Sequence, residues 1–326
     1  MKALRFNKFG NPAEVLRIEE VPDPLPGSEE VLVKVHAASL NPSDVKNVQG
    51  KFADTTLPRI PGRDFAGVIA AGDREMMGQK IWAAGGDIGF TRDGSQAEYI
   101  VIPKKAARPM PKSLSMSEAA AVGISYITAY LGLVEKAGLK DGETLLVTGA
   151  TGGVGSSAAK LAKLKSARVI AVDRRAMDPE QARRLGIDLA LNSESDDIVS
   201  RAKEFTDGKG VDVVFDCVGG PLFETALNSL GVGGRQVNIT SVGDRRVCFD
   251  LLDFYHRQIT LFGIDTAKLD MVACGNILES LRPWFEDSRL TPPQISRTCS
   301  LGELIGAYRQ VADGTAKGKI VLTFER

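Results

Sequence analysis

Hydrophobic and polar residues follow two different patterns along this chain, and the change falls near Ser117. Before it, residues 31–37 (VLVKVHA) alternate apolar and polar positions, as a half-buried strand does. Further short strands, separated by glycine and proline, are predicted at Val68–Ala71, Lys80–Ala84 and Ala97–Ile102. The first 110 residues are therefore predicted to form a compact, mostly β domain.

From Ser117 onward, helices and strands alternate. Residues 117–138 are alanine-rich, are apolar at helical spacing and begin with a serine that can cap a helix. Six strands are then predicted at Thr144–Thr148, Arg168–Asp173, Leu189–Leu191, Val211–Phe215, Arg235–Ile239 and Thr260–Ile264. Amphipathic helices are predicted near 154–165, 179–185, 195–206 and 221–229. This alternation is typical of an α/β fold with a six-stranded, doubly wound parallel sheet.

The C-terminal segment has a different character. Helices are predicted at about 268–287 and 301–313, and a closing strand at Lys319–Phe324. Because the α/β sheet is complete without that strand, we expect it to return to the N-terminal β domain. The expected organisation is a discontinuous domain of residues 1–121 and 267–326, with an α/β domain at 122–266.

The strand at Thr144–Thr148 runs into a glycine turn and then into a helix. Aligned with the dinucleotide fingerprint G-x-G-x-x-G, the turn reads Ala150-x-Gly152-x-x-Gly155. In that fingerprint, backbone N–H groups at a helix N-terminus hold a pyrophosphate. The residues predicted to hold it are Thr151, Gly152, Gly153 and Val154. The alternative glycine signature of short-chain dehydrogenases is excluded, because no tyrosine here has a lysine four residues later.

The coenzyme type is open at this point. Asp173 ends the next strand, 18 residues beyond Gly155, where a carboxylate accepts the ribose hydroxyls and selects NAD. Arg174 and Arg175 follow directly, and guanidinium groups are the usual partners of the 2′-phosphate of NADP. We predict NADPH, with NADH as the alternative.

Composition and residue spacing exclude several classes of function. Among 326 residues, Lys+Arg and Asp+Glu number 41 each, so the chain lacks the basic surface of a nucleic-acid-binding protein. It has two histidines and four cysteines, with no Cys-x-x-Cys pair and no histidine at ligand spacing from a cysteine or the other histidine, so a zinc site built from a close cluster is not expected. The N-terminus lacks the apolar core of a signal peptide, and the apolar runs are shorter than a membrane span. We expect a cytoplasmic protein.

Seven segments carry a family resemblance over nearly the whole chain: MKAL at the N-terminus, SLNPSDVKNVQG (39–50), PGRDFAGVI (61–69), GSQAEYIVIP (94–103), TGATGGVG (148–155), GKGVDVVFDCVGG (208–220) and GKIVL (318–322). They resemble the zinc-independent members of the medium-chain dehydrogenase/reductase superfamily, on the quinone oxidoreductase and enone (alkenal) reductase branch. The resemblance implies a GroES-like catalytic domain and a Rossmann coenzyme-binding domain at the boundaries given above.

Two departures from the zinc alcohol dehydrogenases bear on the reaction. Asn41 stands where those enzymes have a cysteine ligand, and Arg63 stands where they have a histidine ligand. The four-cysteine lobe of those enzymes is also missing between about residues 85 and 110. The resemblance therefore implies no zinc, and without it the oxidation of alcohols loses its Lewis acid.

The family's other roles transfer onto matching positions. Asn41 resembles the asparagine that lies against the nicotinamide ring, and Thr128 the threonine that binds the same end of the coenzyme. The further residues implied to line the coenzyme site are Cys217, Val218, Thr240, Phe262, Gly263, Ile264 and Lys319. Lys46 takes a position that resembles the enone reductases, and we expect it to be the catalytic donor.

These roles predict hydride transfer from NADPH to a quinone or an α,β-unsaturated carbonyl. One alternative is an enoyl-CoA-type reductase, for which Arg59, Arg63 and Arg92 are scattered candidates to bind the CoA phosphates. Another is a non-catalytic NADPH-binding redox sensor. A homodimer is expected from the resemblance, through the strand at Thr260–Ile264, since edge strands favour such pairing.

Overall fold

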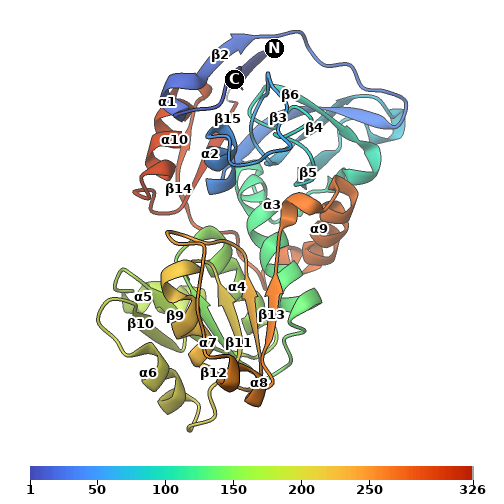
Figure 1. Cartoon of the computed structure of the whole chain (residues 1–326). Coiled ribbons are helices and arrows are strands. Elements are labelled where there is room, and N and C mark those ends of the chain that lie inside the picture. Colours follow the sequence, from blue (N-terminus) through green and yellow to red (C-terminus); the bar gives the residue numbers. More distant parts are fainter. Residues whose placement is uncertain (325–326) are drawn as a thin grey trace. The chain divides into compact units, whose positions relative to one another are not determined.

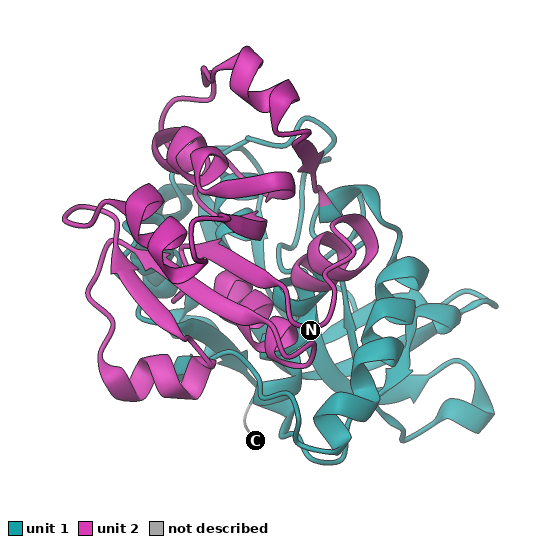
Figure 2. Cartoon of the chain, turned by 90° about the horizontal axis from the view of Figure 1, so that it is seen from below, with its two compact units in different colours: residues 1–127, 266–326 teal, residues 128–265 magenta. Residues whose placement is uncertain are grey.

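A computed structural model of the chain describes residues 1–324, which form two compact units (Figure 2). Unit 1 contains residues 1–127 and continues from residue 266 onward, and unit 2 contains residues 128–265. The sequence predicts these divisions after residue 121 and before residue 267. Unit 1 is thus discontinuous in sequence, and the chain passes between the units at 127/128 and at 265/266.

Unit 1 is built on a seven-stranded sheet, with the strand order β14-β15-β3-β4-β5-β7 and with β6 also paired to β3. The strands are β3 (Glu30–Leu40), β4 (Asp64–Ala71), β5 (Lys80–Ala84), β6 (Tyr99–Pro103), β7 (Arg108–Pro109), β14 (Ile295–Cys299) and β15 (Lys319–Thr323). A separate pair consists of β1 (Lys2–Phe6) and β2 (Leu16–Glu20). The closing strand does return to the β domain, because β15 pairs antiparallel with β3.

Side-chain alternation explains the core of unit 1. Val31, Val33 and Val35 on β3 are buried, while the residues between them are partly exposed, which confirms the predicted strand. The helices are α1 (Pro12–Val15), α2 (Pro42–Val48), α9 (Met271–Glu286) and α10 (Leu304–Ala312), with 3₁₀ turns η1 (Arg74–Met76), η2 (Lys104–Ala106), η5 (Thr266–Lys268) and η6 (Leu301–Glu303). Phe285 of α9 packs edge-on against Trp82 of β5, with 5.8 Å between ring centroids.

Unit 2 is the predicted six-stranded parallel sheet, with the order β10-β9-β8-β11-β12-β13 (Figure 1). Its strands are β8 (Thr144–Thr148), β9 (Arg168–Asp173), β10 (Leu189–Asn192), β11 (Val211–Asp216), β12 (Leu230–Asn238) and β13 (Thr260–Gly263). The helices are α4 (Gly153–Lys163), α5 (Pro179–Leu185), α6 (Ile198–Phe205), α7 (Phe223–Asn228) and α8 (Leu251–His256), with a 3₁₀ turn η4 (Gly220–Leu222). The strand order reverses between β8 and β11, and ligands of such sheets bind at this switch point.

The helix predicted at 117–138 is not continuous. It consists of α3 (Met116–Tyr130) and a π-helical turn, η3 (Leu131–Lys136), with a kink at Gly123. A Cβ atom at Gly123 would lie 2.4 Å from Oδ1 of Asp64, so only glycine allows the kink beside this carboxylate. By length and composition the 21 residues Met116–Lys136 could cross a membrane, but 78% of their most apolar window is buried inside the protein, as in a core helix.

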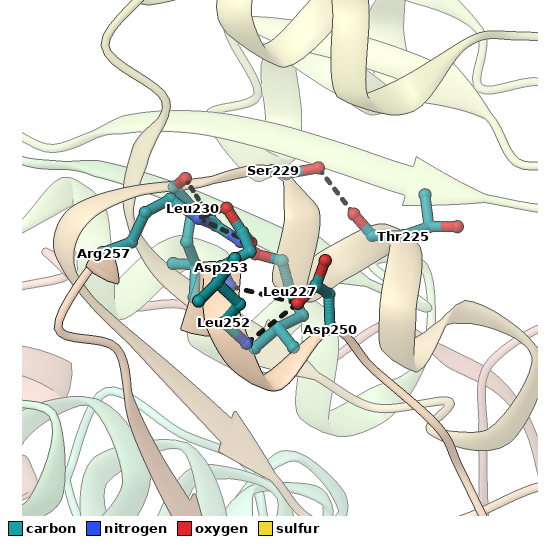
Figure 3. Close-up of polar contacts among 8 residues, drawn as sticks. All are labelled: Thr225, Leu227, Ser229, Leu230, Asp250, Leu252, Asp253 and Arg257. Carbon is teal, nitrogen blue, oxygen red and sulfur yellow. Dashed lines mark hydrogen bonds and ion pairs between the residues drawn. The ribbon is translucent and has the colours of Figure 1, made fainter. Parts of the chain in front are cut away.

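Helix α8 was not predicted, because its six residues are too short to show a period. Figure 3 shows how polar contacts hold it. Asp250 caps its start by accepting hydrogen bonds from the backbone N–H groups of Leu252 and Asp253, at 2.8 and 3.2 Å. Arg257 at its end pairs with Asp253 and donates to the carbonyl of Leu230, at 2.7 Å. The helix is thereby fixed to the beginning of β12.

Candidate active site

The glycine turn between β8 and α4 has the geometry of a phosphate-binding turn. Gly149 has a φ of +63°, which glycine adopts without steric cost. A Cβ atom at Gly155 would lie 2.3 Å from the carbonyl oxygen of Gly149, so helix and turn approach too closely for any other residue. Helix α4 begins at Gly153, and its cap residue Gly152 is exposed. The first N–H groups of α4 are therefore available to an anion.

Asp173 lies at the carboxyl end of β9 and contacts the same turn. Its Oδ2 accepts hydrogen bonds from the backbone N–H of Thr151 at 3.0 Å and from the Thr151 hydroxyl at 2.5 Å. The structure thus brings together two residues that the sequence assigns to the coenzyme. Arg174 and Arg175 follow with exposed side chains.

Sequence reasoning missed Asp216, the last residue of β11. Its side chain is fully buried, and Oδ1 accepts from the Thr148 hydroxyl at 2.5 Å and from the N–H groups of Val218 and Gly219 at 3.0 and 2.9 Å. This carboxylate therefore shapes the turn that carries Cys217 and Val218. An acidic residue directly after the apolar run VVF was the available indication.

The remaining unit 2 candidates gather at the same edge of the sheet. Cys217, Thr240 and Phe262–Ile264 lie at or just beyond the carboxyl ends of β11, β12 and β13, where α/β sheets bind ligands. Burial raises the pKa of the Cys217 thiol well above its usual value, so this residue is a neutral thiol rather than a nucleophile. Thr128 is buried in α3.

Unit 1 holds a second group of candidates, a buried polar cluster around Asp64. Oδ2 of Asp64 accepts from the Ser39 hydroxyl and from Nδ2 of Asn41, both at 2.8 Å. Oδ1 accepts from the backbone N–H of Ile124, also at 2.8 Å. The Lys319 ammonium donates to Oδ1 of Asn41 at 2.6 Å and lies 3.6 Å from Oδ2 of Asp64. We call Ser39, Asn41, Asp64 and Lys319 the Asp64 cluster.

A further carboxylate, Asp44 of α2, is buried next to the Asp64 cluster. It accepts the backbone N–H of Asn41 at 2.8 Å. Burial raises its pKa to about 7; the Asn41 N–H opposes this shift and the charge of Asp64 adds to it. Burial also lowers the pKa of the Lys319 ammonium, against the attraction of Asp64 and Asp44.

Arg63 is the second residue that is predicted to stand at a zinc-ligand position. Its side chain is buried, with the guanidinium 4.9 Å from the centroid of the Phe90 ring and Nη2 donating to the carbonyl of Thr266 at 3.3 Å. A cation, Arg63, therefore stands at one of the two positions expected for zinc ligands, and a second cation, Lys319, is bound to the residue at the other, Asn41. Within residues 1–324, no group of three or more His, Cys, Asp or Glu side chains is placed to hold a metal. These residues do not fit a zinc ion.

Lys46 belongs to the last turn of α2, and its side chain is exposed. Its neighbour Asn47 is buried, donates to the carbonyl of Gly89 and accepts the Thr55 hydroxyl at 2.6 Å. Asn47 thereby fixes helix α2, while the residue before it, Lys46, is exposed.

Comparison with known proteins identifies the family of both units. Residues 27–112 match the model of the alcohol dehydrogenase GroES-like domain, and residues 153–276 match that of the zinc-binding dehydrogenases. Among solved structures, a NAD-dependent alcohol dehydrogenase is 28% identical with a TM-score of 0.90, and each chain is covered completely. A putative NADPH:quinone reductase from Bacillus thuringiensis is 25% identical with a TM-score of 0.86, over 99% of each chain.

Three curated relatives match this chain over almost its full length. A zinc-type alcohol dehydrogenase-like protein of Schizosaccharomyces pombe is 35% identical, over 99% of this chain and 97% of that protein. The 2-methylene-furan-3-one reductase of Solanum lycopersicum is 32% identical, over 99% and 79%. The human quinone oxidoreductase is 28% identical, over 99% and 97%. The chain is an oxidoreductase of the medium-chain dehydrogenase/reductase superfamily and belongs to its quinone oxidoreductase and enone reductase branch.

Proposed function

We propose that this protein is a zinc-independent reductase that uses NADPH to reduce a quinone or an α,β-unsaturated carbonyl. The observation that carries the proposal is the Asp64 cluster. Asn41, which replaces a metal ligand of the zinc enzymes, has its amide oxygen bound to the Lys319 ammonium, and Arg63 replaces a second ligand. The names of the tomato and human relatives, a 2-methylene-furan-3-one reductase and a quinone oxidoreductase, support the two acceptor classes.

Such a reaction needs hydrogen-bond donors rather than a metal. NADPH, when bound, supplies the hydride. Hydride addition to the β-carbon of an enone breaks the C=C π bond and leaves negative charge on the carbonyl oxygen, after which a proton adds to the α-carbon. A donor placed at that oxygen contributes roughly 3 kcal/mol to transition-state stabilisation. We assign this role to Lys46 and assign Asn41 to the nicotinamide end of the coenzyme.

The proposed coenzyme preference rests on the end of β9. Oδ2 of Asp173 is already engaged by Thr151, and the two residues that follow it, Arg174 and Arg175, are exposed. A 2′-phosphate would gain charge-assisted hydrogen bonds there. We therefore favour NADPH over NADH, bound through the glycine turn, Thr128, Cys217, Val218, Thr240 and Phe262–Ile264.

The enoyl-CoA alternative receives less support. Two of its three candidate phosphate ligands are in ion pairs, Arg59 with Asp93 at 2.9 Å and Arg92 with Glu30 at 2.5 Å. The third, Arg63, is buried. Free CoA phosphates would have to compete with these existing partners.

We further propose a homodimer through the edge of the unit 2 sheet. β13 is the last strand of its sheet, and Leu251, Leu252 and Tyr255 of the neighbouring α8 are exposed. Pairing β13 with its copy would satisfy the strand edge and cover these side chains. A Leu252→Glu variant should sediment as a monomer, whereas a monomeric wild type would contradict the proposal.

One panel of assays tests the function. NADPH and NADH are titrated, and coenzyme oxidation is followed with 1,4-benzoquinone, an enone and crotonyl-CoA. We expect NADPH oxidation with the quinone or the enone, and a lower kcat/KM in a Lys46→Met variant. Turnover of crotonyl-CoA alone would favour the enoyl-CoA reductase, and tight NADPH binding without any turnover would favour a sensor. An unchanged Lys46→Met enzyme on every acceptor would remove the catalytic role of Lys46.

A further inference from the structure

Lys319 is a lysine in an environment that normally excludes one. It is the first residue of β15, and only 6% of its surface is exposed. Burying an ammonium group is costly unless it is paired and hydrogen-bonded. The sheet register explains its location: Ile320 pairs with Leu40, the last residue of β3, so that Lys319 lies beside Asn41, the next residue of the chain. A strand 278 residues away in sequence thus delivers the ammonium to the Asn41 amide.

The contacts of Lys319 indicate which partner it serves. Its ammonium is 2.6 Å from Oδ1 of Asn41 but 3.6 Å from Oδ2 of Asp64. Asp64 already accepts three other hydrogen bonds, from Ser39, Asn41 and Ile124, each at 2.8 Å. The carboxylate is therefore largely satisfied without the lysine, and the direct hydrogen bond of Lys319 goes to the amide.

The two charged partners of Asn41 together permit only one orientation of its side-chain amide. An amide has an oxygen that only accepts and an NH₂ group that only donates. Here the oxygen faces the ammonium of Lys319, and the NH₂ group faces the carboxylate of Asp64 at 2.8 Å. A half-turn of the amide would put the NH₂ group against the ammonium and the oxygen against the carboxylate. Both contacts would then be repulsive, so the orientation is fixed and one N–H of the NH₂ group is left to donate elsewhere.

We propose that Lys319 is a positioning residue that fixes the Asn41 amide for hydride transfer and does not act by binding the coenzyme. The inference rests on the proposed function, in which Asn41 meets the nicotinamide end of NADPH. A misplaced group at a reacting centre can cost about 100-fold in rate. The loss of Lys319 should therefore lower the rate of reduction while leaving the affinity for NADPH intact.

The experiment compares Lys319→Met and Lys319→Arg with wild type and with Lys34→Met, which removes a lysine from β3 far along the strand from Asn41. Lys319→Met should lower kcat on the best acceptor by at least tenfold, with the Kd of NADPH unchanged within twofold. Lys319→Arg, which keeps a donor, should recover part of the rate, and Lys34→Met should behave as wild type. A raised Kd for NADPH with an unchanged kcat would overturn the proposal and make Lys319 a coenzyme ligand.

A double-mutant cycle separates positioning from general damage. If Lys319 acts through Asn41, then Asn41→Ala combined with Lys319→Met should be no slower than Asn41→Ala alone. Multiplying losses would contradict the proposal. If Lys319→Met does not fold, Lys319→Gln takes its place, because its neutral amide can donate or accept and so no longer selects one orientation of the Asn41 amide.

A spectroscopic readout tests the amide without any turnover. In protein labelled with ¹⁵N-asparagine, the side-chain NH₂ signals of Asn41 should shift in Lys319→Met, because the amide oxygen loses the hydrogen bond from the Lys319 ammonium. Signals that stay unchanged would overturn the positioning role. If wild type reduces none of the acceptors, the proposed function fails while this measurement still decides whether Lys319 holds the amide.

Discussion

Asp44 gives the protein a dependence of stability on pH that one substitution should remove. Its carboxyl group is buried beside Asp64, Arg63 and Lys319, and Tyr308 is another ionisable neighbour. In the folded protein the pKa of Asp44 is about 7, against an ordinary value of 3.8. A carboxyl whose pKa is raised on folding binds its proton more tightly in the folded state. Its contribution to stability is thus complete at low pH and is lost as the pH rises through 7.

The size of this effect follows from the two pKa values. Each tenfold difference in proton affinity corresponds to about 1.4 kcal/mol, so the complete contribution at low pH is ~4 kcal/mol. Between pH 5 and pH 8, the contribution of Asp44 to the free energy of unfolding should fall by ~2.5 kcal/mol. The substitution Asp44→Asn keeps an oxygen that can accept the hydrogen bond from the N–H of Asn41, but the new side chain cannot titrate.

Urea unfolding of wild type and Asp44→Asn at half-unit steps from pH 5 to pH 8 measures the effect. The difference in free energy of unfolding between the two proteins should move in favour of the variant by ~2.5 kcal/mol over this range. The comparison with the variant matters because Lys319, whose own pKa is lowered by burial, is present in both proteins. Parallel curves, with a constant difference at all pH values, would refute a neutral Asp44 in the folded state below pH 7.

Two further predictions concern unit 2. Replacing both Arg174 and Arg175 by serine should raise the Kd of NADPH at least about tenfold and leave the Kd of NADH within twofold, because hydrogen bonds to charged groups contribute about 1.5–3 kcal/mol. Fluorescence titrations measure both constants, and equal losses of affinity for the two coenzymes would argue against a 2′-phosphate site. Gly155→Ala should lower Tm and abolish coenzyme binding, since its Cβ would lie 2.3 Å from the carbonyl oxygen of Gly149 and overpacking costs about 1–3 kcal/mol. Gly306→Ala on α10 is the matched control, with no atom within 4 Å of its Cβ, and a Tm as low as that of Gly155→Ala would refute the steric argument.

Patterns that are local in sequence predict the fold well. β8 and β9 have the predicted bounds, Thr144–Thr148 and Arg168–Asp173, because each is a short buried apolar run. The return of β15 to unit 1 could also be predicted, because the six predicted strands of the unit 2 sheet are complete without it. β14 was missed, since its residues Ile295–Cys299 are largely exposed and polar and show no hydrophobic alternation.

Features that depend on contacts between distant residues could not be predicted. The kink at Gly123 exists because Asp64, 59 residues earlier, occupies the space of a Cβ atom and accepts the N–H of Ile124. The sequence assigned Lys319 to the coenzyme, but its bond to Asn41 depends on the register of β15 against β3. Local spacing contains no information on either contact.

The hydride transfer proposed for this protein needs no metal. The most direct measurement follows NADPH oxidation with an enone and with 1,4-benzoquinone, using protein dialysed against EDTA and shown by elemental analysis to be free of zinc. We expect the same kcat/KM before and after dialysis, and no gain when zinc is added back. Activity that disappears with EDTA and returns with zinc would contradict it.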